Sequence, residues 1–138
     1  MKNPLRIVIV GASGKMGQAL IKQVSSNSGL LLAGAIDQAS CSTLGMDAGT
    51  LFGIKTDVII NDDFESAIKK GDYVIDFTRP EASMGYLEVC VKNNIKYILG
   101  TTGFSDKEKE KIFLASKSIP ICFAPNMSVG VNLLVSLV

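Results

Sequence analysis

The sequence predicts an α/β fold in which a doubly wound, mostly parallel sheet carries helices on both faces. Runs of β-branched and aliphatic residues alternate along the chain with segments whose apolar residues recur at helical spacing. The first run, residues 5–10, ends at Gly11, and Gly14 and Gly17 follow before a helical pattern begins. A strand, a glycine turn and a helix in this order are typical of Rossmann-type sheets, which bind a dinucleotide at that turn.

Composition narrows the class of protein. The chain has 138 residues, of which 47% are apolar and 20% charged, so it is long enough for one globular domain with a core. A net charge of +1 without a basic cluster argues against nucleic acid as a partner, and no apolar run approaches the roughly 20 residues that span a bilayer. The three cysteines lie outside any C-x-x-C motif, which is typical of reduced thiols in a cytoplasmic protein.

The chain contains no histidine. This absence excludes Ser-His-Asp and Cys-His catalytic arrangements and most zinc sites, and we expect no metal. It also removes the commonest proton donor near neutral pH. Any proton chemistry must therefore use another residue type or a part of the protein outside this sequence.

The glycine turn suits a phosphate, because the first turn of a helix has N–H groups without intrahelical partners and a dipole that favours an anion. Gly11 is expected to turn the chain, Gly14 to let the phosphate approach, and Gly17 to let the helix lie close to the strand, while Lys15 adds a cation. The spacing, G-x-x-G-x-x-G, is one residue longer than usual, and a turn that binds nothing is the alternative. The predicted contacts are Gly11, Ala12, Ser13, Gly14, Lys15 and Met16.

The second apolar run, residues 30–36, ends in Asp37, which lies 20 residues after Gly17 (37 − 17 = 20). An acid at this distance, at the end of the second strand, is the usual partner of the adenosine ribose hydroxyls. An acidic residue that only opens a loop is the alternative. Taken together, the loop, the spacing and the strand end favour a nicotinamide or flavin dinucleotide as the cofactor.

The middle of the chain is less regular. Residues 38–53 are mostly small and polar and include several glycines. We expect a long loop here, with at most a turn of helix, and long loops are often functional or mobile. Residues 58–60 form a short strand candidate. A short helix follows, opened by residues 62–65 and closed by Gly71.

The next predicted strand, residues 73–77, leads into a helix that we expect to begin with Thr78 as its cap and Glu81 reaching back. Residues 93–94 end this helix. Its expected inward face consists of Met84, Leu87, Cys90 and Val91.

Residues 95–99 form the following strand, and residues 100–103 form the loop at its carboxyl end. Ser105 and Glu108 are spaced as a capping box, which predicts the start of a charged helix. The expected inward residues of that helix are Ile112, Phe113 and Ala115.

The last strand is predicted at residues 119–123. A turn at residues 124–128 follows, and residues 129–138 resemble the start of another helix.

Loops at the carboxyl ends of the strands should line one cleft, because ligands of such sheets bind there. The loops concerned are residues 11–17, Asp37, and residues 77–79, 100–102 and 124–127. Thr101, Thr102 and Asn126 could hydrogen-bond a ribose or a carboxamide, although each alone also fits ordinary turn chemistry. Arg79 fits an anionic ligand and an exposed helix start about equally well.

Five motifs, taken together, resemble one known family. They are residues 11–17 (GASGKMG), 44–49 (LGMDAG), 76–81 (DFTRPE), 100–104 (GTTGF) and 126–132 (NMSVGVN). In order and spacing they resemble bacterial 4-hydroxy-tetrahydrodipicolinate reductase, also called dihydrodipicolinate reductase, over essentially the whole chain. Five ordered motifs are far more specific than one glycine loop.

The resemblance implies NAD(P)H-dependent reduction of a small dicarboxylate, (2S,4S)-4-hydroxy-2,3,4,5-tetrahydrodipicolinate, on the diaminopimelate route to lysine. It implies that NADH or NADPH contacts the loop at residues 11–16, Asp37 and two later segments, which are Gly100, Thr101 and Thr102, and Ala124, Pro125, Asn126 and Met127. The family often has a basic residue where this chain has Gln38. Asp37 would repel a 2′-phosphate, which Lys15 partly offsets, so we expect NADH to be used at least as well as NADPH.

The resemblance also implies a second domain that this sequence lacks. In the family that domain carries a histidine-rich catalytic motif, a lysine and a Ser-Gly-Thr substrate loop, and it forms the homotetramer. We therefore expect residues 1–128 to be the dinucleotide-binding domain and residues 129–138 to begin the helix that leads to the missing domain. No catalytic residue is assigned to this chain, which alone should bind dinucleotide but reduce no substrate. A stand-alone redox sensor without catalysis is the alternative function.

Overall fold

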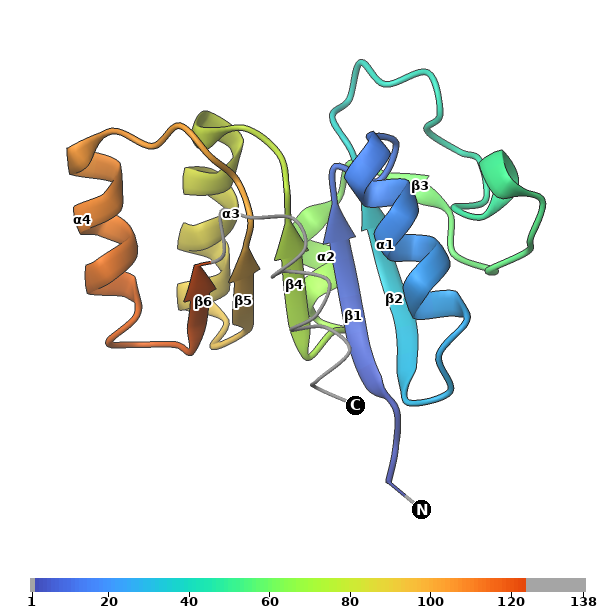
Figure 1. The fold of residues 1–138 in the computed structure, drawn as a ribbon, viewed down its shortest axis with the longest axis horizontal. Coiled ribbons are helices and arrows are strands. Elements are labelled where there is room, and N and C mark those ends of the chain that lie inside the picture. The colour runs from blue at the N-terminus through green and yellow to red at the C-terminus, as the bar shows by residue number, and fades with distance from the viewer. Residues whose placement is uncertain (1, 124–138) are drawn as a thin grey trace.

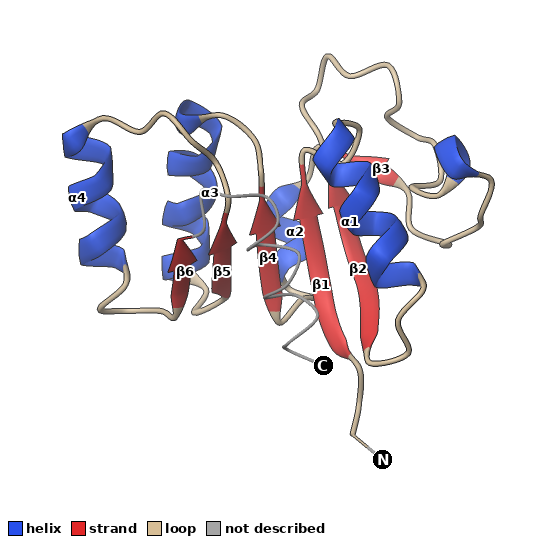
Figure 2. Cartoon of the chain, viewed as in Figure 1, coloured by secondary structure: helices blue, strands red, loops and turns tan. Residues whose placement is uncertain are grey.

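The computed structural model describes residues 2–123, which form a six-stranded parallel sheet with helices on both faces (Figures 1 and 2). The strands are β1 (Leu5–Val10), β2 (Leu30–Ile36), β3 (Ile60–Asn61), β4 (Tyr73–Asp76), β5 (Lys96–Leu99) and β6 (Ile121–Phe123). The helices are α1 (Lys15–Ser25), α2 (Phe64–Ile68), α3 (Pro80–Lys92) and α4 (Asp106–Ala115), with a 3₁₀ turn, η1 (Thr50–Phe52). The strand order is β3-β2-β1-β4-β5-β6, so the predicted Rossmann-type fold is confirmed.

The order of the strands places a switch point between β1 and β4. The chain moves outward from β1 to β2 and β3, and then crosses back to β4 on the other side of β1. Loops that leave neighbouring strands in opposite directions open a crevice at the carboxyl edge of the sheet. The glycine turn lies at this edge, directly after β1.

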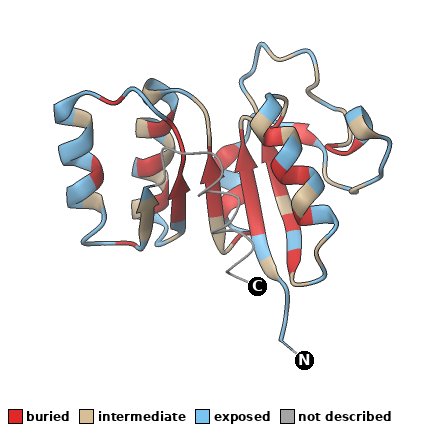
Figure 3. Cartoon of the chain, in the orientation of Figure 1, coloured by how far each residue is buried: buried red, intermediate tan, exposed pale blue. Residues whose placement is uncertain are grey.

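Each face of the sheet has its own core, because alternate residues of a strand point to opposite faces. Ile7 and Ile9 of β1 pack in the cluster that includes α1, whereas Val8 and Val10 pack in the cluster that includes α2, α3 and α4. All four are at most 1% exposed. Figure 1 shows α1 in front of β1 and β2 with α2 behind them, and Figure 3 shows burial concentrated along the central strands. Burial on both faces explains the continuous apolar run of β1.

The start of α3 differs from the prediction. Thr78 does not cap this helix, because its hydroxyl donates instead to the carboxyl group of Asp76 at 2.6 Å. Arg79 is the N-cap residue and makes no side-chain cap, while Pro80 occupies the first turn. The capping box of α4 is confirmed, with Ser105 and Glu108 bonded reciprocally.

Two further expectations are wrong in detail. Phe113 is 63% exposed, whereas its neighbour Ile112 is buried, so the inward face of α4 is narrower than predicted. The third strand is displaced from residues 58–60 to residues 60–61, because Ile59 forms an antiparallel bridge with the preceding loop. The turn and helix expected at residues 124–138 lie outside the described residues.

The long loop between β2 and β3 runs back along the outer edge of β3. The N–H of Gly45 donates to the carbonyl of Ile60 at 2.9 Å, and the N–H of Ile60 donates to the carbonyl of Met46 at 2.9 Å. Asp47 bridges to Ile59 in antiparallel fashion. The outward-facing main-chain groups of this short edge strand are therefore bonded by the chain's own loop.

Asp47 fixes the same loop through its carboxyl group. That group accepts hydrogen bonds from the N–H groups of Thr56, Gly49 and Asp57, and from the hydroxyl of Thr56, at 2.8–3.2 Å. The bond from the N–H of Thr56 is the largest of the effects that lower the pKa of Asp47 from 3.8 to about 2. The charged form therefore favours the folded loop.

Replacement of Asp47 by asparagine should make the loop's contribution to stability independent of pH. A carboxyl group whose pKa is lower in the folded state stabilises fully above its unfolded pKa, and this stabilisation is lost as the pH falls through the folded value. We expect the difference in Tm between wild type and Asp47→Asn to be constant above about pH 5 and to shrink between about pH 4 and pH 2. Thermal melts across this range measure it. Asp62→Asn is the charge-matched control, and a difference that persists unchanged at pH 2 would contradict the assignment.

Candidate functional site

Each glycine of the turn meets a different structural need. Gly11 has a φ of 74°, a left-handed conformation that favours glycine. A Cβ on Gly17 would lie 2.0 Å from the carbonyl oxygen of Gly11, so only glycine lets α1 lie this close to the turn. A Cβ on Gly14 would meet only that same oxygen, at an ordinary 3.4 Å. The fold therefore requires Gly11 and Gly17, whereas Gly14 keeps the space above the turn open.

The main-chain N–H groups of the turn fall into two sets. Those of Ala12, Ser13 and Gly14 donate to acceptors within the protein at 2.8–3.1 Å. Those of Lys15, Met16 and Gly17, in the first turn of α1, have no acceptor among the described residues. Of these open donors, those of Lys15 and Met16 lie at the helix N-terminus next to an exposed lysine side chain, where an anion can bind.

Asp37 lies at the carboxyl end of β2, beside the turn. One carboxyl oxygen accepts a hydrogen bond from the N–H of Ser13, and the other accepts one from the N–H of Gln38, both at 2.8 Å. Each oxygen has a further lone pair for another donor. Asp37 therefore fixes the turn and also presents acceptors that a ribose could use.

A pocket of about 280 Å³ opens at this place. It is lined by Gly11, Gly14, Asp37, Gln38, Phe77, Thr78, Arg79, Ala82 and Tyr86. The loops after β1, β2 and β4 thus line one cleft, as the sequence predicts. Arg79 belongs to this cleft as well as to the helix start.

Two pocket residues, Ala82 and Tyr86, are not identified by the sequence reasoning. They lie three and seven positions after Arg79 on α3, so they share its helical face. That spacing is the signal that could have found them. Burial raises the pKa of Tyr86, and the carboxyl groups of Asp76 and Asp37 raise it further, so its hydroxyl remains a neutral donor.

The loop after β5 contributes less to this pocket than expected. Gly100 lies against the ring of Phe77, since a Cβ there would come within 2.0 Å of a ring carbon. Thr101 is 2% exposed and its hydroxyl is engaged in internal hydrogen bonds, whereas Thr102 is exposed. None of the three lines the pocket. The other predicted contacts, Ala124, Pro125, Asn126 and Met127, lie outside the described residues.

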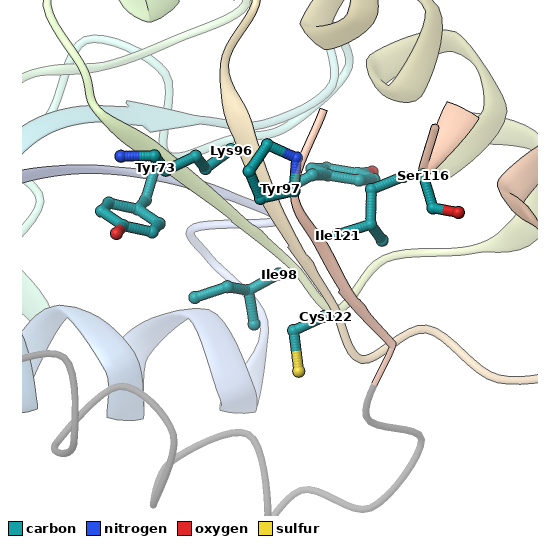
Figure 4. Close-up of a pocket in the computed structure, with 8 residues that line it drawn as sticks. Tyr73, Lys96, Tyr97, Ile98, Ser116, Ile121 and Cys122 are labelled. Carbon is teal, nitrogen blue, oxygen red and sulfur yellow. The ribbon is translucent and has the colours of Figure 1, made fainter. Parts of the chain in front are cut away.

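A second hollow, of about 470 Å³, lies toward the amino-terminal ends of β4, β5 and β6 (Figure 4). It is lined by Tyr73, Lys96, Tyr97, Ile98, Ser116, Pro120, Ile121 and Cys122. The Nζ atom of Lys96 lies 5.0 Å from the centre of the Tyr73 ring. Because the glycine turn is at the opposite edge of the sheet, this hollow is not part of the candidate site.

No described helix is both long enough and apolar enough to cross a membrane. Within residues 2–123, no three side chains of the metal-binding types come together.

Comparison with known proteins decides the family. Residues 5–127 match the family described as "Dihydrodipicolinate reductase, N-terminus". The chain belongs to this family. Similar curated proteins named 4-hydroxy-tetrahydrodipicolinate reductase come from Aromatoleum aromaticum (49% identical over 94% of the chain), Laribacter hongkongensis (48% over 94%) and Thiobacillus denitrificans (43% over 96%). The chain spans 47%, 48% and 50% of these relatives, which is about half their length.

Solved structures extend the likeness to the dihydrodipicolinate reductase fold. The dipicolinate-bound dihydrodipicolinate reductase from Paenisporosarcina sp. TG-14 is 28% identical, with a TM-score of 0.72 over 89% of this chain and 48% of its own. A putative oxidoreductase from Magnetospirillum magnetotacticum MS-1 has a TM-score of 0.66 at 16% identity over 88% of this chain and 38% of its own, which shows a shared fold only.

Proposed function

We propose that this chain is the cofactor-binding half of a 4-hydroxy-tetrahydrodipicolinate reductase and that it holds NADH or NADPH at the glycine turn. In this proposal the diphosphate accepts hydrogen bonds from the N–H groups of Lys15 and Met16, and Asp37 accepts them from the adenosine ribose. The observation that carries the proposal is the pairing, beside one pocket, of open N–H donors with a carboxyl group. Ala12, Ser13, the loop after β5 and residues 124–127 are the further proposed contacts.

The family supports the rest of the proposal. The curated relatives are reductases about twice as long as this chain. We infer that residues 1–128 are the dinucleotide-binding domain and that residues 129–138 lead to a second domain, which supplies the catalytic groups, the dicarboxylate site and the homotetramer contacts. The hydride chemistry belongs to the cofactor, so these residues bind and orient it without turning over substrate on their own.

The choice between NADH and NADPH depends on charge at the ribose. The Asp37 carboxylate repels a 2′-phosphate, and the neighbouring Gln38 supplies no compensating cation. Lys15 on the turn and Arg79 in the pocket offset part of this repulsion. NADH should therefore bind at least as tightly as NADPH.

Calorimetric titration of the chain with NADH and NADPH tests the proposal. We expect both cofactors to bind. Asp37→Asn should lower the affinity for NADH by about tenfold, since hydrogen bonds to a charged acceptor are lost. The affinity for NADPH should fall less than that for NADH, because the same substitution removes the repulsion of the 2′-phosphate. The preference should therefore move toward NADPH.

Asp57→Asn is the matched control for this titration. Its side chain is 78% exposed and outside the pocket, and its φ of 61° suits asparagine. It removes the same charge and should leave both affinities unchanged. Wild type that binds neither cofactor would overturn the proposed function, whereas Asp37→Asn that binds NADH as wild type does would overturn the role of Asp37.

A further inference from the structure

A buried carboxyl group stands at the carboxyl end of β4. Asp76 is 0% exposed, and one of its oxygens accepts hydrogen bonds from the N–H and the hydroxyl of Thr78, at 2.8 and 2.6 Å, and from the hydroxyl of Thr101 at 3.3 Å. The other oxygen accepts a hydrogen bond from the hydroxyl of Tyr97. Ser83 donates to the hydroxyl of Thr101 at 2.9 Å. These five residues are called the Asp76 cluster below.

The Asp76 cluster contains no cation. The ion pairs among residues 2–123 are Arg6–Asp72 and Lys55–Asp57, and neither includes a member of the cluster. A buried carboxyl group without a cationic partner is costly unless hydrogen bonds satisfy it, and apolar residues would fill a core at least as well. What this group provides, and an apolar residue would not, is a fixed geometry of the segments that bond to it.

Those segments border the candidate site. Thr78 belongs to the turn before α3 and lines the pocket, where its methyl group would lie 2.9 Å from a Cβ on Gly11. Thr101 anchors the loop after β5 and so sets the position of the exposed Thr102. Tyr97 reaches the carboxyl group from within β5, where burial and the charge of Asp76 raise the pKa of its hydroxyl well above the ordinary value and keep it a donor.

Asp76 and Asp37 lie on opposite sides of β1 in the sheet, at the ends of β4 and β2. A dinucleotide whose adenosine ribose binds Asp37 crosses the switch point, so its other half lies toward β4 and β5. We propose that Asp76 is a positioning residue for the nicotinamide half of the dinucleotide, acting through Thr78 and Thr101. This inference rests on the proposed function.

The test compares NADH with ADP, which carries the adenosine and the diphosphate but lacks the nicotinamide riboside. Calorimetry of Asp76→Asn should show NADH binding weakened by at least about tenfold and ADP binding changed by less than about threefold. Tyr97→Phe removes one donor from inside the sheet without touching the pocket, and it should reproduce the same selective loss with a smaller factor. If Asp76→Asn fails to fold, Tyr97→Phe decides alone.

Ile68→Val is the control for general destabilisation. Ile68, on α2, is 1% exposed and belongs to the same core as Tyr97. Its side chain takes no part in the hydrogen bonds of the Asp76 cluster. It should lower Tm and leave both affinities unchanged. Unchanged NADH binding in the folded cluster variants, or an equal loss of NADH and ADP binding, would overturn the proposal. Wild type that binds neither compound would instead overturn the proposed function.

Discussion

Gly17→Ala is expected to lower the free energy of unfolding by about 3 kcal/mol or more, a large part of the stability of a small domain. A Cβ at this position would lie 2.0 Å from the carbonyl oxygen of Gly11 and 2.8 Å from the main chain of Ala12. Both obstacles are backbone, so α1 must move away from β1. That movement would open the core that Leu20 and Ile21 form with the sheet.

Denaturant unfolding of Gly17→Ala measures this loss, and the chain offers a matched control. Gly85 is an exposed glycine inside α3, and a Cβ there would meet nothing within 4 Å. Gly85→Ala should raise the free energy of unfolding by about 0.5–1 kcal/mol, because alanine is the better helix former. A Gly17→Ala variant as stable as wild type would show that the contact between α1 and the turn is wrong.

Gly14→Val is expected to weaken NADH binding by about 100-fold or more while the protein remains folded. Gly14 is exposed, and its φ of −71° and ψ of 167° suit any residue. A valine side chain there would lie at the N-cap position of α1, directly before the open N–H groups of Lys15 and Met16. A phosphate could then no longer approach those donors.

Titration with NADH, together with a thermal melt, separates this effect from unfolding. Gly14→Ala adds a single methyl group, so it should lower the affinity for NADH less than Gly14→Val does. Its Tm should be close to that of wild type. The graded series is the informative result, because steric exclusion depends on side-chain size. Undiminished NADH binding by Gly14→Val would place the diphosphate elsewhere.

The local sequence pattern was sufficient to predict the glycine turn and the neighbouring carboxyl group. The left-handed turn at Gly11 and the close approach of α1 at Gly17 follow from the spacing of these glycines after a strand, and Asp37 follows from the distance to the next strand end. These features involve neighbours in sequence or one repeat of the strand–helix unit. The residue spacing of such motifs is enough to predict their geometry.

Long-range pairing explains what local pattern could not supply. Thr78 has the spacing of a helix cap, but its hydroxyl donates to Asp76 only two positions earlier, so the local pattern left two acceptable partners open. Thr101 appears as a polar loop residue, yet its hydroxyl bonds to Ser83, 18 positions earlier, and to Asp76, 25 positions earlier. The bonds of Thr101 are decided only when the sheet brings β4 and β5 together.

The loop that runs along β3 has a consequence for colloidal behaviour. A parallel sheet exposes unpaired main-chain groups at its edges, and such edges recruit strands from other molecules into aggregates. Here the N–H and carbonyl of Ile60 already bond to Met46 and Gly45. A strand from another molecule could pair at this edge only after it displaced the loop that Asp47 holds in place.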